Sequence, residues 1–216
     1  MTTTRIIEPE GVTGEFTVES YDRMMRGLME QGYLDTSQII EAGITSGTAL
    51  EIGPGPGYLG IDWLQRTTNT SLKGLDISAD MIAVANKNAK EFGVDHRVEY
   101  VLGDAKQILF GDNTFDAVFT NGSLHEWSDP KAVFNAIHRV LKPGGHYCIS
   151  DLRRDIALFA KVILQFAIPK ERKQGFISSL NASYTQKELM ALVHDTNLNS
   201  ARVGIGLWTV AITGTK

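Results

Sequence analysis

A glycine-rich turn between a strand and a helix constrains the fold of this 216-residue chain more than any other feature. The segment ALEIGPGPGYLG, residues 49–60, places Gly53, Gly55 and Gly57 directly after an apolar β-prone run and before a helical stretch. Glycines at such a turn adopt positive φ and let a ligand approach the backbone, while the helix offers free N–H groups. In open α/β sheets such ligands bind at the carboxyl ends of the strands, where the strand order reverses.

Short β-prone runs alternate with helical stretches from Thr48 onward. This alternation predicts parallel strands joined by crossover helices, whereas the last two strands, linked only through Gly206, can form only an antiparallel hairpin. The expected fold is therefore an α/β, Rossmann-like, doubly wound seven-stranded sheet, mostly parallel, with an antiparallel C-terminal hairpin. The predicted strands are residues 49–52, 71–75, 98–102, 115–120, 147–150, 201–205 and 208–213.

Local signals predict the helix boundaries. Ser78 is a candidate N-cap for a helix to about residue 92, and Asp129 followed by proline begins a helix through residue 141. Gly144 and Gly145 are expected to end that helix. Thr185 with a glutamate three residues later predicts a capping box for a helix to about residue 197.

The chain divides into an N-terminal helical cap, residues 1–47, and a main domain, residues 48–216. Apolar residues recur at helical spacing over 19–30, and a second short helix is expected over 37–42. Within the main domain, an apolar helical insertion at about 155–183 follows the fifth strand. Three roles for this insertion stay open: packing on the cap, lining an apolar acceptor pocket, or forming a homodimer contact.

Charge and cysteine content exclude several classes of protein. With 21 Lys and Arg against 25 Asp and Glu, the net charge is −4, so no global positive field exists to attract nucleic acid. The single cysteine, Cys148, excludes an intrachain disulfide and Cys-rich zinc frameworks, and no metal site is expected. Cys148 lies in a predicted buried strand and is interpreted as a core residue.

The N-terminus lacks a basic start followed by an apolar run, and the most apolar window, residues 156–168, is shorter than the about 20 residues of a membrane span. No signal peptide and no membrane span are therefore expected, and a cytoplasmic protein is predicted.

The residues around the glycine turn narrow the class of ligand. Dinucleotide folds favour a third glycine where this chain has Tyr58, which weakens a nicotinamide-dependent oxidoreductase as the alternative function. Glu51 at the strand end favours a cationic ligand, a sulfonium or an ammonium group. Asp76 ends the second strand, 19 residues after Gly57, where a carboxylate accepts from ribose hydroxyls. Asp104, after the third strand, is placed to accept from an adenine amino group.

Together these segments resemble a class I S-adenosylmethionine-dependent methyltransferase of the small-molecule type, similar to the ubiquinone/menaquinone biosynthesis enzymes. The resemblance rests on ALEIGPGPG at 49–57, GLDIS at 74–78, GDA at 103–105, FDAVFTNGSLHEWSDP at 115–130 and VLKPGGHYCISD at 140–151.

The resemblance implies that S-adenosyl-L-methionine is the cofactor and S-adenosyl-L-homocysteine the product. It assigns the glycines at 53, 55 and 57 to the methionine part, with Glu51 beside them. It also implies that the N-terminal segment closes over the cofactor. The remaining implied contacts are Asp76 with ribose, Asp104 and Ala105 with adenine, Ile77 and Met81 packed on the base, and Asn121 near the methionine amino group.

The segment after the fourth strand narrows the acceptor. It reads Asn121-Gly122-Ser123-Leu124 rather than N/D-P-P-Y/F, which disfavours methylation of nucleic-acid bases or protein amides. A small-molecule acceptor is expected, with nitrogen, oxygen, sulfur and carbon all open as the methylated atom. A protein that binds S-adenosylmethionine without catalysis stays an alternative.

Methyl transfer is catalysed mainly by holding nucleophile, methyl carbon and sulfur in line at about 3 Å. A general base is needed only for a protonated nucleophile, and His125 is the candidate because it follows the fourth strand. Asp151 is expected to orient His125 or to bind the substrate. Tyr21 and Tyr184 are candidates for the acceptor pocket, and Trp127 and Trp208 are candidates for its walls.

Overall fold

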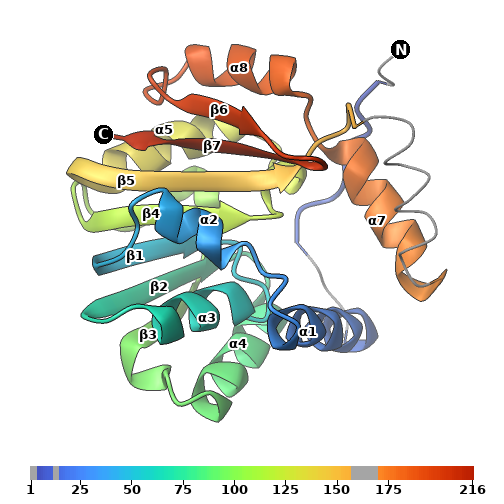
Figure 1. Ribbon diagram of the computed structural model, residues 1–216, viewed down its shortest axis with the longest axis vertical. Coiled ribbons are helices and arrows are strands. Elements are labelled where there is room, and N and C mark those ends of the chain that lie inside the picture. The colour runs from blue at the N-terminus through green and yellow to red at the C-terminus, as the bar shows by residue number, and fades with distance from the viewer. Residues whose placement is uncertain (1–3, 12–14, 157–169) are drawn as a thin grey trace.

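The computed structural model describes residues 4–11, 15–156 and 170–216, which form one seven-stranded sheet covered by helices (Figure 1). The strand order is β3-β2-β1-β4-β5-β7-β6, so the order reverses between β1 and β4. The α/β expectation is confirmed. The strands are β1 Gly47–Ile52, β2 Thr70–Asp76, β3 Val98–Leu102, β4 Phe115–Asn121, β5 Leu141–Leu152, β6 Arg202–Ile205 and β7 Thr209–Thr215.

The strand pairing also agrees with the sequence-based expectation. Strands β1 to β5 pair in parallel, whereas β7 runs antiparallel to β5 and to β6. The predicted C-terminal hairpin is therefore confirmed. Because all parallel strands end at the same edge, the chain segments that follow β1, β2, β3 and β4 meet there.

Helices cover both faces of the sheet, because alternate residues of each strand enter two separate cores. Leu50 and Val118 pack in one core with α5 and α8, while Ala49 and Phe119 pack in the other with α2, α3 and α4. The helices are α1 Glu15–Glu30, α2 Thr36–Glu41, α3 Tyr58–Arg66, α4 Ala79–Glu91, α5 Pro130–Val140, α7 Lys170–Ala182 and α8 Gln186–His194, with short 3-10 turns η1 Asp95–Arg97, η2 Ala105–Gln107 and η3 Leu124–Glu126.

Two helix ends differ from the prediction. The helix after Asp129 stops at Val140, and β5 begins at the next residue, so Gly144 and Gly145 lie inside the strand rather than after a helix. They are needed at an irregularity in the β4–β5 pairing: Gly144 has φ +78°, and a Cβ on Gly145 would lie 3.0 Å from the Asp116 carbonyl oxygen. Helix α8 ends at His194, about one turn before the predicted end.

The three predicted N-caps are present. The Ser78 side chain accepts from Met81 N–H, Asp129 accepts from Ala132 N–H, and Thr185 forms a reciprocal capping box with Glu188. These bonds satisfy backbone donors at the first turn of α4, α5 and α8.

Helices α1 and α7 stand beyond the carboxyl ends of the parallel strands, on the right in Figure 1. Helix α7 forms the later part of the predicted insertion, and residues 157–169 of the insertion lie outside the described residues. The predicted N-terminal helices correspond to α1, which begins at Glu15 rather than at residue 19, and to α2.

Candidate functional site

The glycine turn forms a tight loop between β1 and α3. Gly53, Gly55 and Gly57 have φ of +64°, +54° and +86°, values that disfavour any residue with a side chain. A Cβ on Gly57 would lie 2.5 Å from the Tyr100 hydroxyl oxygen, so the loop is also packed too closely for a larger residue. Because Gly53 N–H donates to the Leu75 carbonyl at 2.9 Å, the loop is joined to the end of β2.

A cavity of about 740 Å³, including its open mouth, lies at this edge of the sheet beside the point where the strand order reverses. Most of the residues expected to hold the cofactor line this cavity: Gly53, Gly55, Asp76, Ile77, Met81, Asp104, Ala105 and Asn121, together with Tyr21 and Trp127.

Asp76 connects the end of β2 to the glycine loop. Its Oδ2 accepts from Gly55 N–H at 3.0 Å, and its Oδ1 accepts from Ser78 N–H at 2.9 Å. The side chain is buried, and burial raises the pKa of Asp76 above its ordinary value. The carboxylate therefore supports the loop and also faces the cavity, where each oxygen retains a lone pair for a further donor.

Asp104 and Lys106 follow β3 and line the cavity next to the end of β2. Asp104 Oδ1 accepts from Lys106 N–H at 2.8 Å, which caps η2, and the Lys106 ammonium lies 3.3 Å from Asp104 Oδ2. The same ammonium is 2.9 Å from Glu10 Oε2 and donates to Ser128 Oγ at 2.8 Å. Glu10 thus attaches the N-terminal segment, defined here as residues 4–11, to this part of the cavity.

Asn121 ends β4 and reaches toward the N-terminal helices. Its Nδ2 donates to Asp35 Oδ2 and to Ser150 Oγ, both at 2.8 Å. Asp35 belongs to the turn before α2. The amide is therefore held in one orientation at the floor of the cavity.

Glu51 does not line the cavity, contrary to the expectation that it presents a negative charge to the ligand. Alternation along β1 turns its side chain toward α3, where it is 1% exposed and a Cβ on Gly60 would lie against it. Burial raises the pKa of Glu51 to about 8, with Asp76 adding to the increase. The carboxyl is therefore mostly protonated at neutral pH, so Glu51 supplies no negative charge that would favour a cationic ligand.

His125 and Asp151 are brought together in a buried cluster. Asp151 Oδ2 accepts from the His125 backbone N–H at 2.7 Å, and both carboxylate oxygens lie 2.9 Å from Nδ1. On the other side of the ring, Nε2 lies 3.4 Å from Glu8 Oε2. His125 is only 5% exposed and is not among the residues that line the cavity.

The protonation of His125 reflects these neighbours. Burial by itself lowers the pKa of the imidazole, but the carboxylates of Asp151, Glu126 and Glu8 outweigh burial and raise the pKa above its ordinary value. Burial, together with the carboxylates of Glu8 and Asp151, also raises the pKa of Glu126, whose Oε2 accepts from Gly11 N–H at 3.0 Å.

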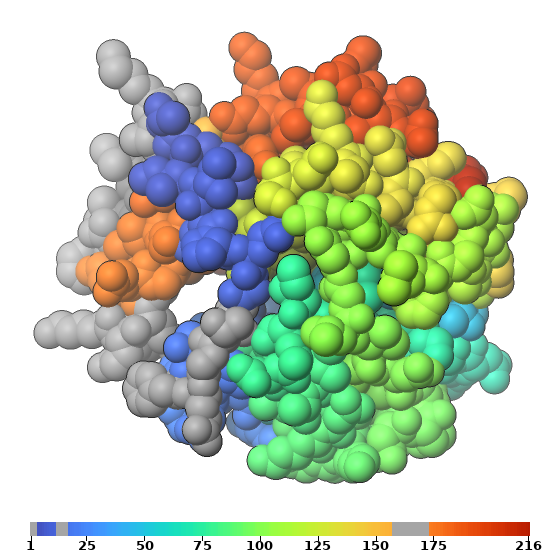
Figure 2. Space-filling model, turned by 180° about the vertical axis from the view of Figure 1, so that it is seen from behind, coloured from blue at the N-terminus to red at the C-terminus, as the bar shows by residue number. Residues whose placement is uncertain are grey.

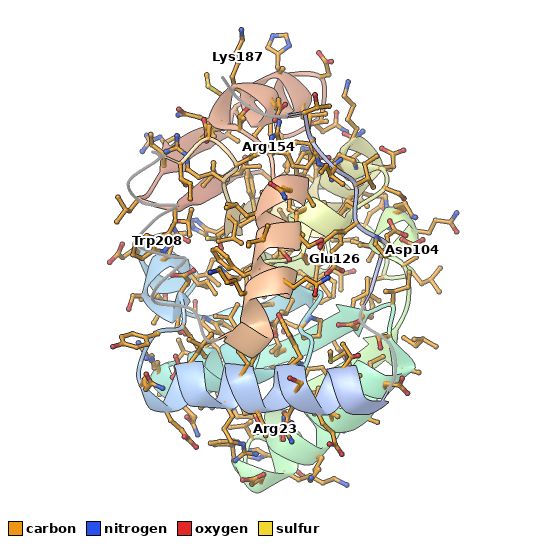
Figure 3. All side chains as sticks on the ribbon, turned by 90° about the vertical axis from the view of Figure 1, so that its right-hand side faces the viewer. Arg23, Asp104, Glu126, Arg154, Lys187 and Trp208 are labelled. Atoms are coloured by element: carbon orange, nitrogen blue, oxygen red, sulfur yellow. The ribbon has the colours of Figure 1, made fainter. Side chains whose placement is uncertain are left out.

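The aromatic candidates lie in different places. Tyr21 of α1 faces the cavity beside Gly55, and burial together with Glu126, Asp151 and Asp76 raises the pKa of its hydroxyl to about 12. Tyr184 is buried, with the Arg5 guanidinium 4.1 Å from its ring centre. Trp208 is 41% exposed and lies on the opposite side of α7 from Glu126 and Asp104 in Figure 3.

Several residues at the site were not predicted from the sequence. Glu8, Glu10 and Gly11 belong to a segment without helical or strand periodicity, and it lies across the face of the molecule between α7 and the loops after β3 and β4 (Figure 2). Lys106 follows the GDA segment, and Glu126 lies inside the segment 115–130 next to His125; only these positions in the sequence could have indicated them.

Comparison with known proteins finds similarity to methyltransferases. Residues 50–149 match the family model described as "Methyltransferase domain". The methyltransferase GfsG of Streptomyces halstedii is 32% identical over 127 residues, which cover 58% of this chain and 45% of that protein. The ubiquinone/menaquinone biosynthesis C-methyltransferase UbiE of Blochmanniella pennsylvanica is 33% identical over 103 residues, 47% of this chain and 41% of that protein. The match therefore spans less than half the length of these two relatives.

A solved structure from Methanococcus maripaludis, a candidate S-adenosyl-L-methionine-dependent methyltransferase, is 26% identical with a TM-score of 0.74 and covers 97% of both chains.

Within residues 4–11, 15–156 and 170–216 there is no helix with the length and apolar character needed to cross a membrane.

Proposed function

Because residues 50–149 match the family model described as "Methyltransferase domain", we propose that the chain transfers a methyl group from S-adenosylmethionine to a small-molecule acceptor. One observation carries the proposal. The glycine loop, Asp76 and Asp104 follow three neighbouring strands and line one cavity at the point where the strand order reverses.

The residues present fit this cofactor. Asp76 would accept from the ribose hydroxyls, Asp104 and Ala105 would contact the adenine edge, and Ile77 and Met81 would pack on its faces. Gly53 and Gly55 leave room for the methionine part, and Asn121 lies where its amino group is expected. Gly57 does not line the cavity but shapes the loop. The buried side chain of Glu51 supports the loop from the side of α3.

When bound, the cofactor supplies a methyl group on a sulfonium centre whose leaving group is a neutral thioether. The chain then has to hold the acceptor in line with that methyl group and to exclude water, which is catalysis by positioning. Tyr21 can donate a hydrogen bond to the acceptor, because its raised pKa keeps the hydroxyl protonated. If the acceptor atom carries a proton, His125 would take it at Nε2, with Asp151 fixing the ring through Nδ1.

The two alternative functions predict different behaviour. In a nicotinamide-dependent oxidoreductase the loop would approach a pyrophosphate, but here Tyr58 fills the position of the third glycine and is buried against the N-terminal helix, donating to Asp22 at 2.9 Å. A catalytically silent protein would bind S-adenosylmethionine without turnover.

Turnover tests the proposal directly. The purified chain is incubated with S-adenosylmethionine and a mixed library of amines, thiols, phenols and quinols, and S-adenosylhomocysteine is measured with and without each acceptor. Acceptor-dependent product formation supports the proposal, whereas binding without turnover indicates a silent binding protein. Full activity of His125→Ala across the pH range would remove the base assignment.

Compartment and assembly are also proposals. We propose a cytoplasmic protein, because the single thiol of Cys148 is buried and unpaired. For the insertion, packing on the cap, lining the acceptor pocket and forming a homodimer contact all stay predictions. Light scattering of the full chain distinguishes the dimer from the other two.

A further inference from the structure

The N-terminal segment covers the candidate base with one particular side chain. Arg5 attaches the segment to the end of α7, because its Nε donates to the Ala182 carbonyl at 2.5 Å, and Ile6 N–H donates to the Asn181 carbonyl at 3.1 Å. Glu10 attaches the segment to Lys106 at the other side of the cavity. Glu8 lies between these two anchors, and its carboxylate faces Nε2 of His125.

This contact occupies the nitrogen that the proposed reaction needs. Nδ1 of His125 faces Asp151 and Nε2 faces Glu8, so each ring nitrogen lies beside a carboxylate. A nitrogen beside a carboxylate is favoured as a donor, and an imidazole with both nitrogens protonated cannot accept a proton. Arg5 Nη2 also donates to the His125 carbonyl at 2.7 Å, so the same segment fixes the backbone of this residue.

We propose that Glu8 is a positioning residue for His125: it holds the imidazole doubly protonated while the N-terminal segment covers the site, and it must leave Nε2 before His125 can take a proton from the acceptor. This inference rests on the proposed methyl transfer, and it adds a residue of the N-terminal segment to the reaction.

Every proton in the transfer step has a defined source and destination. When Glu8 leaves, the Nε2 proton passes to solvent and the ring becomes neutral. During transfer the acceptor's N–H, O–H or S–H bond breaks, its proton binds Nε2, and its lone pair forms the bond to the methyl carbon while the carbon–sulfur bond breaks. The return of Glu8 then stabilises the protonated ring.

Other charged or titratable groups also surround the ring. Asp151 lies on β5, Glu126 on η3 and Tyr21 on α1, while Arg5 contributes the nearby positive charge and Tyr184 follows α7. Asp151 and Glu126 belong to the sheet domain and stay in place when the N-terminal segment moves. Glu8 is thus the carboxylate among them whose position depends on the segment.

The first test measures the titration of His125 by NMR in the ligand-free protein. Glu8→Gln keeps the shape of the side chain and removes its charge, so the pKa of His125 is expected to fall. Glu10→Gln is the matched control, because it neutralises a glutamate of the same segment that faces Lys106 instead. An equal His125 titration in wild type and Glu8→Gln would overturn the inference.

Glu8→Asp separates charge from disruption of the segment. It keeps the carboxylate, so His125 is expected to titrate closer to the wild-type pH than in Glu8→Gln. If Glu8→Gln and Glu8→Asp lower the pKa of His125 equally, Glu8 only holds the segment in place and the inference is wrong. These measurements require no acceptor, so they remain decisive even if methyl transfer is not found.

The second test follows the pH dependence of kcat/KM, which reports groups of the free enzyme. The acid limb of Glu8→Gln should move to lower pH by the same amount as the NMR titration, with about tenfold higher kcat/KM on that limb for a shift of one unit. In Glu10→Gln the limb should keep its wild-type position. A limb that stays unchanged in Glu8→Gln contradicts the role of Glu8, whereas absent turnover contradicts the proposed function.

Discussion

The buried carboxyl of Glu51 makes stability depend on pH in a way that a single substitution should remove. Its pKa is about 8 in the folded chain, against an ordinary value of 4.5. Below pH 4.5 the group is protonated in both states and contributes no pH dependence. As pH rises toward 8, the unfolded chain releases a proton that the folded chain keeps, and the folded state loses stability.

The loss is about 1.4 kcal/mol per pH unit, which amounts to roughly 4–5 kcal/mol by pH 8. Glu51→Gln keeps the size of the side chain and removes the titration. We therefore expect the free energy of unfolding, measured in urea from about pH 5 to pH 8, to fall in wild type relative to Glu51→Gln. Glu30→Gln, exposed at the end of α1, is the control. A constant difference between wild type and Glu51→Gln over this range would refute the placement of a neutral carboxyl behind the loop.

Two further substitutions and one reactivity measurement test other parts of the structure. Gly57→Ala should reduce the free energy of unfolding by about 1–3 kcal/mol in urea, because of its φ of +86° and the contact with the Tyr100 hydroxyl. Adding Tyr100→Phe should restore part of that loss, and no restoration would contradict the contact. Cys148, with a pKa raised by burial to about 12, should react with a thiol reagent only after unfolding, and rapid labelling of the native chain would show the strand to be wrongly placed.

The parts of the fold that were predicted correctly depend on local chemistry. Alternating β-prone and helical stretches, the caps at Ser78 and Thr185, and the short link at Gly206 each act within a few residues. The predicted helix end at Gly144 and Gly145 is wrong, because the role of these glycines depends on the pairing of β4 with β5, which no local signal contains.

Some residues of the site could likewise be predicted from the sequence, whereas others are placed only by the folded chain. Asp76, Asp104 and Asn121 follow strands, so the rule that parallel strands end at one edge was enough to group them. Glu51 is next to the loop in sequence, yet the alternation of β1 turns it away from the cavity. Glu8 lies 117 positions from His125, in a segment without periodicity, and only the folded chain brings the two together.

Cofactor binding tests the central claim most directly. Calorimetric titration of the full chain with S-adenosylhomocysteine, and separately with NAD, should show binding of the methionine nucleoside and none of NAD. In Asp76→Ala the dissociation constant for S-adenosylhomocysteine should rise by at least about tenfold, because hydrogen bonds to a charged carboxylate contribute about 1.5–3 kcal/mol each. Failure to bind either S-adenosylmethionine or S-adenosylhomocysteine, or equal affinity in wild type and Asp76→Ala, would contradict the account.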